Sequence, residues 1–157
     1  EFDFYKLASD IKIRLITNGS YLYKKEIAAA WRGLSLEKEI WFKIDSTQSD
    51  KIKIINQVNL TTKQIKKNLE SAIAVSPTII QTCLTKINNQ LPSANEIQDY
   101  VNFLKPYEKQ INSIHLYSLA RPTEQKTAFT LERLTNQEMT QIADKMDTLS
   151  IPIFTFS

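Results

Sequence analysis

The sequence predicts an α/β protein in which a mainly parallel sheet of about five strands is covered by alternating helices. Short runs rich in isoleucine and aromatic residues alternate with amphipathic segments, and three helix-start signals separate them. Each connection is long enough for a right-handed crossover between parallel strands. A closed eight-stranded barrel needs roughly 250 residues, and the chain has 157. We therefore expect an open sheet or part of a barrel, in a single domain over residues 1–157.

The first half of the chain supplies two of the strands. Residues 11–17 (IKIRLIT) are rich in isoleucine and end in Asn18-Gly19, which favours a turn. A helix follows, and its inner face is expected to carry Tyr23, Ile27, Ala30 and Trp31. The apolar and aromatic run 40–45 (IWFKID) predicts the second strand, and a polar loop is expected from there until Thr61.

The second half repeats the alternation three times. Capping boxes begin at Thr61, Ser93 and Thr135, and each predicts the first turn of a helix. The remaining strands are expected at 78–85, 111–119 and 151–156. The last helix is expected to turn Met139, Ile142, Met146 and Leu149 inward.

Composition excludes several classes of function. One cysteine, Cys83, and one histidine, His115, allow no internal disulfide and no cluster of soft metal ligands. Two glycines are too few for a dinucleotide-binding turn or a P-loop. The net charge of +3 is dispersed, so a nucleic-acid surface is not indicated, and no apolar run is long enough to span a membrane. We expect a soluble, cytoplasmic protein.

Ligands of parallel α/β proteins bind beyond the carboxyl ends of the strands. Lys43 and Asp45 lie on one face of the second strand by the period of two, either as a structural pair or as ligand-binding groups. Arg121, just past the fourth strand, is either an anion contact or a solvated loop residue. Cys83 is expected to be a small core residue, and His115 a hydrogen-bonded core or rim residue rather than a catalyst.

Four short runs at these strand ends resemble a known family when they are taken together. They are LITNGS (15–20), WFKIDS (41–46), IIQTCLT (79–85) and SIHLYSLARPT (113–123). In this order and spacing they resemble the later part of a radical S-adenosylmethionine (radical SAM) core domain. The chain is similar in particular to iron-sulfur oxidoreductases related to the wybutosine-synthesis enzymes, and the likeness covers residues 11–157.

The resemblance implies a partial (βα)6 barrel in which three cysteines hold a [4Fe-4S] cluster. In that family the cluster reduces S-adenosylmethionine to a 5′-deoxyadenosyl radical. The three-cysteine loop and the glycine-rich motif of the family are absent here, and Ile87-Asn88-Asn89 stands where a second glycine-rich motif would follow the strand. The chain is therefore identified as the carboxyl-terminal part of such an enzyme, without ligands for the cluster and inactive by itself.

The resemblance also implies cofactor-binding residues and partners. S-adenosylmethionine would contact Asn18, Lys43, Asp45, Ser46, Gln81, Thr82, Tyr117, Ser118 and Arg121. No catalytic residue and no metal ligand is assigned within the chain. The expected partner is the missing amino-terminal part of the parent protein, and the exposed edge of strand 11–17 could also lead to self-association.

Two other functions remain open from the residues. A non-enzymatic α/β module could bind a small ligand or a protein through the same strand ends. A nucleic-acid binder is the least favoured, because acidic residues are interleaved with the lysines and arginines.

Overall fold

The computed structural model describes residues 11–123 and 128–156, which form one α/β layer structure. The strands are β1 (Lys12–Thr17), β2 (Glu37–Lys43), β3 (Thr78–Ile87), β4 (Ile111–Ser118), β5 (Leu131–Arg133) and β6 (Ile153–Phe156). The helices are α2 (Lys25–Gly33), α3 (Ser49–Asn56), α4 (Thr62–Ile73), α5 (Ala94–Leu104) and α6 (Asn136–Asp144), with a 3₁₀ turn, η1 (Lys105–Tyr107), after α5.

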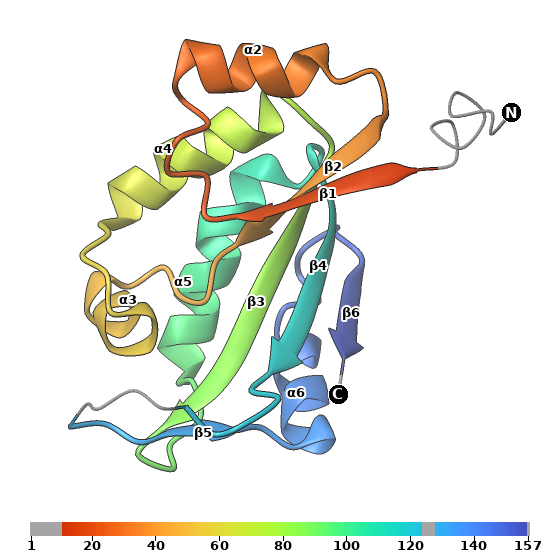
Figure 1. Cartoon of the computed structure of the whole chain (residues 1–157). Coiled ribbons are helices and arrows are strands. Elements are labelled where there is room, and N and C mark those ends of the chain that lie inside the picture. Colours follow the sequence, from red (N-terminus) through yellow and green to blue (C-terminus); the bar gives the residue numbers. More distant parts are fainter. Residues whose placement is uncertain (1–10, 124–127, 157) are drawn as a thin grey trace, which may run out of the picture.

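Five strands form a parallel sheet in the order β1-β2-β3-β4-β6, and the helices cover one of its faces (Figure 1). This confirms the predicted fold class, including parallel neighbours in chain order. The short strand β5 was not expected. It pairs antiparallel with the last residues of β3, where Thr85 lies opposite Arg133. The end of β3 therefore has a strand partner outside the parallel sheet.

All three predicted capping boxes are present. Thr61, Ser93 and Thr135 each accept a hydrogen bond from the backbone N–H three residues later, and the side chain there accepts one in return. These bonds satisfy backbone donors that a helix start otherwise leaves unpaired. The local sequence therefore fixes where α4, α5 and α6 begin.

The predicted start of the second strand at residue 40 was wrong, because β2 begins at Glu37 and ends at Lys43. The missed residues are charged, and their charge is what joins them to β1. Glu39 lies within 2.9 Å of Lys12 and 2.8 Å of Arg14. An apolar pattern cannot reveal a strand segment that ion pairs hold in the sheet.

The polar loop expected between this strand and Thr61 was also wrong, because it contains helix α3. The helix has no side-chain hydrogen bond at its N-cap, Gln48, and Ile52 is its one buried residue. Its signals in the sequence are therefore weak. Gln57 closes it in the left-handed conformation, with φ of 55°.

The inner faces of two helices differ from the prediction in part. In α2, Trp31 is buried with Ala28, whereas Ile27 and Ala30 are exposed, as is Tyr23, which lies before the helix. All four apolar residues predicted after Thr135 are buried, yet Met146 and Leu149 lie beyond the end of α6. A buried turn continues the apolar spacing there without continuing the helix.

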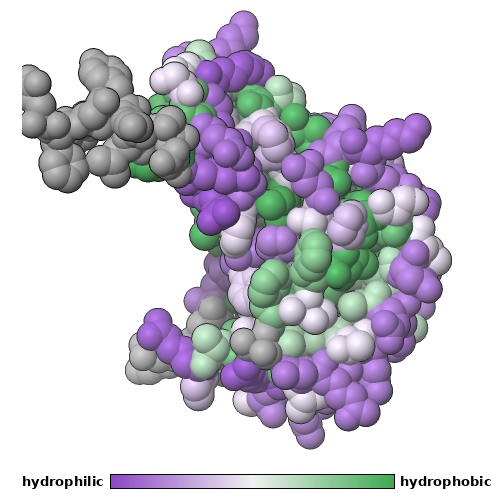
Figure 2. Space-filling model, turned by 90° about the vertical axis from the view of Figure 1, so that its right-hand side faces the viewer, coloured by the Kyte–Doolittle hydropathy of each residue, from purple (hydrophilic) through white to green (hydrophobic). Residues whose placement is uncertain are grey.

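The core lies between the helices and one face of the sheet. It includes Ile40, Phe42, Ile80, Ile114 and Leu116 from the strands, all fully buried. The alternate residues of the same strands point to the other face, which the described helices leave open. Figure 2 shows the molecule hollowed on one side, as expected for part of a barrel.

Two turns require unusual backbone geometry. Gly19 has φ of +72°, and a Cβ atom there would lie 2.5 Å from the Phe42 ring, so glycine allows the turn after β1 to reach the core. Asn88 and Asn89 also have positive φ, at 51° and 62°. They form a two-residue turn in which Ile87 and Gln90 exchange two backbone hydrogen bonds of 3.0 Å.

Candidate functional site

A row of side chains crosses the open face, from the carboxyl end of β2 over the middle of β3 and β4 to β6. The register places Lys43 of β2 beside Gln81 of β3, Gln81 beside His115 of β4, and His115 beside Phe154 of β6. Tyr117 follows two residues after His115 and shares its face. Polar and aromatic groups thus line the side of the sheet that would face the inside of a barrel.

Lys43 and Asp45 form the ionic centre of this region. The ammonium of Lys43 donates to Asp45, whose side chain is only 1% exposed. Asp45 also accepts from the Asn56 side chain at 2.6 Å and from the backbone N–H of Cys83 at 2.9 Å. A buried carboxylate needs such donors, so Asp45 is held in one position by groups from β2, β3 and α3.

Burial and the charge of Asp45 together shift the pKa values of Lys43 and Cys83. Burial alone would lower the pKa of Lys43, but the charge of Asp45 and their hydrogen bond raise it above its ordinary value. Burial, and then the charge of Asp45, raises the pKa of the Cys83 thiol to about 11. Cys83 is therefore a protonated, buried thiol at neutral pH, as expected of a small core residue.

A cavity of about 230 Å³ adjoins the pair. Four of the nine predicted site residues line it, namely Asn18, Lys43, Asp45 and Ser46, together with Asn56. Residues from the ends of β1 and β2 therefore meet at one place, as the carboxyl ends of parallel strands should.

The other predicted residues divide between the two faces. Gln81 and Tyr117 flank Lys43 on the open face, with the Lys43 ammonium 5.9 Å from the centre of the Tyr117 ring. Thr82 points to the helices and shares a 2.6 Å hydrogen bond with Tyr100 of α5. Ser118 donates to the carbonyl of Leu84.

Ser118 also accepts a hydrogen bond from the backbone N–H of Leu134. Thr82 and Ser118 are thus bonded within the fold. Arg121 is exposed in the loop after β4. The structure therefore brings together six of the nine predicted residues: Asn18, Lys43, Asp45, Ser46, Gln81 and Tyr117.

Asn56 is a site residue that sequence reasoning missed. Its side-chain amide donates to the same Asp45 oxygen as Lys43. The omission follows from the missed helix α3, since Asn56 is its last residue. Recognising that helix would have brought an amide back toward the end of β2.

His115 lies among aromatic rings on the open face. Its ring centre is 5.2 Å from that of Trp41, 5.7 Å from Phe154 and 5.0 Å from Phe156. The Ser113 hydroxyl is 3.2 Å from its Nε2 atom. Burial lowers the pKa of His115, and the charge of Glu39 offsets part of this effect. The surroundings favour the neutral imidazole.

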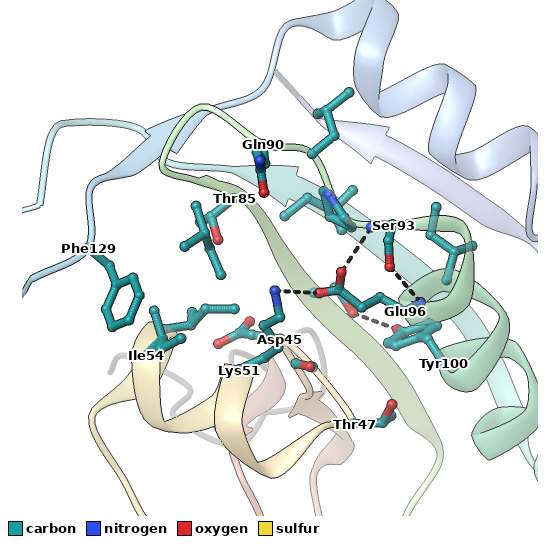
Figure 3. A pocket seen from close by; sticks show the side chains of 18 of the residues that line it. Asp45, Thr47, Lys51, Ile54, Thr85, Gln90, Ser93, Glu96, Tyr100 and Phe129 are labelled. Atoms are coloured by element: carbon teal, nitrogen blue, oxygen red, sulfur yellow. Dashed lines mark hydrogen bonds and ion pairs between the residues drawn. The ribbon is translucent and has the colours of Figure 1, made fainter.

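A second cavity, of about 290 Å³, lies at the carboxyl end of β3 between α3 and α5 (Figure 3). Asp45 and Ser46 line both cavities. An ion pair of 3.3 Å between Lys51 of α3 and Glu96 of α5 joins the two helices beside this second cavity. The carboxyl end of the sheet thus has two hollows that share the end of β2.

The residues present do not fit an iron-sulfur cluster. A cubane cluster is held by cysteine thiolates, whereas the chain has a single cysteine whose thiol is buried and protonated. Within residues 11–123 and 128–156, no group of three His, Cys, Asp or Glu side chains could hold a metal ion.

Over the part of the chain that the structure covers, no helix is both long and apolar enough to cross a bilayer.

Two solved structures share this architecture. A domain of a pyruvate-formate lyase-activating enzyme from Bacteroides vulgatus ATCC 8482 has a TM-score of 0.66 and 16% identity, over 94% of this chain and 82% of that one. A radical SAM methyltransferase from Sphaerobacter thermophilus has a TM-score of 0.55 and 9% identity, over 92% of this chain and 40% of that one. The likeness shows that the chain has a radical SAM-like α/β fold.

Sequence comparison adds no closer assignment. No protein-family model matches the chain, and no curated protein matches it. The assignment to this fold therefore depends on the structure.

Proposed function

We propose that this chain is the later part of the barrel of a radical SAM iron-sulfur oxidoreductase related to the wybutosine-synthesis enzymes, and that its open face binds S-adenosylmethionine in the intact parent. The observation that carries the proposal is the ionic centre at Lys43 and Asp45. It lies at the strand ends of a radical SAM-like sheet. The fold supports the general class, and the polar row supports the ligand.

Lys43 is suited to bind the carboxylate of the methionine moiety. An ammonium has three N–H donors, and Asp45 takes one of them. Lys43 is about one-third exposed, so its remaining donors are accessible from the cavity that it lines. A cation next to Asn18 and Ser46 offers the mixture of charge and hydrogen bonds that an amino acid head group requires.

Asp45 acts through Lys43 in this proposal. Its oxygens already accept from three donors, and its side chain is almost completely buried. It is therefore a positioning residue that holds the Lys43 ammonium in place and keeps it charged. Gln81 and Tyr117 on the neighbouring strands would contact the ligand from the same open face.

The cluster must come from elsewhere in the parent, because the residues present here do not fit it. We propose that an upstream segment carries a Cys-x-x-x-Cys-x-x-Cys element and the first strands of the barrel. β1 supports this proposal, since among the described strands it pairs only with β2 and so has a free edge. Ile16 of β1 is 60% exposed on the open face, where an upstream strand could cover it.

Titration calorimetry of the full-length, cluster-loaded parent with S-adenosylmethionine tests the site. Asp45→Ala should weaken binding by about 1–3 kcal/mol, because Lys43 loses the partner that orients it. Asp50→Ala is the matched control, since Asp50 is an exposed residue of α3, and its effect should stay within roughly 0.5 kcal/mol. Equal affinities of the two variants would remove Lys43 and Asp45 from the proposed site.

A second candidate is a non-enzymatic module that binds a partner protein through the open face. The exposed apolar side chains there favour it, because Phe154 and Phe156 of β6 are each about half exposed, and Ile16 of β1, at the opposite edge of the sheet, is also exposed. The upstream coding sequence separates the two functions. A three-cysteine element supports the enzyme, whereas its absence together with tight association of two copies of this chain would support the module.

A further inference from the structure

The larger cavity, of about 290 Å³, has no role in the proposed function. The ends of β2 and β3, the loop after β3, and helices α3 and α5 surround it (Figure 3). Among the residues that the structure describes, Lys43, Gln81, His115 and Tyr117 of the open-face row do not line it. It is therefore a separate hollow, which meets the other at Asp45 and Ser46.

The walls of this cavity combine aliphatic and polar side chains. Its apolar lining includes Ile54, Leu84, Ile87, Leu91, Ile97 and Met146, and its polar lining includes Asp45, Lys51, Thr85, Gln90 and Glu96. A hollow with apolar walls and converging polar groups is typical of a small-molecule site. At about 30 Å³ for each non-hydrogen atom, its volume would hold on the order of ten such atoms.

The charged groups that line the cavity are already neutralised. Asp45 accepts from Lys43 and two further donors. Lys51 pairs with Glu96, which also accepts from the backbone N–H of Ser93. A charged ligand would lose its hydration on entering the cavity and would find no unpaired charged group there to bind. The electrostatics therefore favour an uncharged ligand.

Thr85 supplies the polar group that lacks a partner. The residue is 4% exposed, and its hydroxyl has no hydrogen bond within the described part of the chain. Figure 3 shows this hydroxyl among the side chains that line the cavity. Buried hydroxyls are generally hydrogen-bonded, so an orphaned one at the wall of a cavity indicates a missing ligand atom. Thr82, three residues earlier, is satisfied by Tyr100.

We propose that this cavity binds an uncharged, mainly aliphatic molecule of about ten non-hydrogen atoms, whose single polar head group hydrogen-bonds with the Thr85 hydroxyl. A primary amide or an alcohol on a medium-length chain fits this description. The alkyl chain of the ligand would lie against the isoleucine and leucine side chains of the cavity. Its head group would reach the end of β3.

The test uses octanamide and octanoate as probes, because they have the same number of non-hydrogen atoms and differ in charge. Methyl-labelled NMR spectra of this chain would follow Ile87 and Ile97 in the cavity, with Ile13 of β1 as a distant reference. Thr85→Val removes the hydroxyl and keeps the shape. Thr78→Val is the matched control, since Thr78 is a buried threonine of β3 that lies outside the cavity and donates to the Ser76 carbonyl.

Octanamide should shift the Ile87 and Ile97 methyl signals in a saturable way and leave Ile13 unchanged. Octanoate should bind at least roughly tenfold more weakly, and Thr85→Val should weaken octanamide binding by roughly tenfold. Thr78→Val should change the affinity less than about twofold.

Three results would overturn the proposal: no saturable shift with octanamide, equal binding of octanoate, or unchanged affinity in Thr85→Val. Because neither S-adenosylmethionine nor the cluster is present in this experiment, its outcome is independent of the proposed function.

Discussion

The two faces of the sheet differ in chemistry although the same strands form them. On the helix-covered face, Ile40 and Phe42 of β2 are fully buried in the core. On the open face, Trp41 and Lys43 of the same strand lie among charged and aromatic side chains. The period-two alternation of one strand therefore places a buried core on one side of the sheet and charged and aromatic groups on the other.

The largest expected difference between the two faces is in the loss of stability when one phenylalanine is removed from each. Phe42→Ala should lower the free energy of unfolding by about 3–5 kcal/mol, because it opens a cavity in the core beneath Gly19. Phe154→Ala on the open face should cost about 1 kcal/mol or less, since that side chain is 51% exposed. Urea denaturation of both variants measures the contrast, and similar losses would contradict the assignment of the faces.

A smaller effect is expected from two threonines of β3. Thr82→Val should lower the free energy of unfolding by about 1–3 kcal/mol, because the buried Tyr100 hydroxyl loses its partner. Thr85→Val should be neutral or slightly stabilising, since its hydroxyl has no partner to lose. Thermal and urea unfolding would compare them. A substantial loss in Thr85→Val would show that its hydroxyl is satisfied within the fold.

The smallest effect concerns pH and the charged part of the open face. Burial would raise the pKa of Glu39, but hydrogen bonds from Lys12, Arg14 and Trp41 lower it to about 2. Because the folded protein holds this carboxylate charged, its stabilising effect is present above about pH 4.5 and is lost as the pH falls toward about 2.

Glu39→Gln should therefore lower the free energy of unfolding by roughly 1 kcal/mol at pH 7, since the solvent-exposed Lys12 and Arg14 are screened by water. The deficit should shrink as the pH falls below about 4.5. Urea titrations at pH 7 and pH 3 give the comparison. Glu37→Gln is the control, because Glu37 pairs with Lys12 while 70% exposed, and it should have little effect at either pH.

The parts of the fold that the sequence predicts well are those set by local chemistry. The capping boxes at Thr61, Ser93 and Thr135 were found because each depends on residues three positions apart. Helix α3 and strand β5 were missed because neither has such a signal. β5 exists through its pairing with the end of β3, which only the folded chain provides.

The candidate site was predictable to a similar extent. The rule that ligands bind at the strand ends selected Lys43, Asp45 and Gln81, which the structure brings together. It could not tell that Gln81 lies on the open face and Thr82 on the helix-covered face, since that requires knowing which side the helices cover. It also could not reveal that Asp45 has three donors, because Asn56 and the Cys83 backbone come from distant parts of the chain.

The turn after β3 has a consequence for the unfolded chain. Asn88 and Asn89 hold the left-handed conformation that glycine usually supplies. Glycine would give the unfolded chain many more backbone states to lose, whereas asparagine tolerates the left-handed region and restricts those states. The chain thus closes this hairpin at a lower entropic cost than a glycine pair would require. Asn88 also lines the larger cavity, so the turn that closes at this lower cost forms part of the cavity wall.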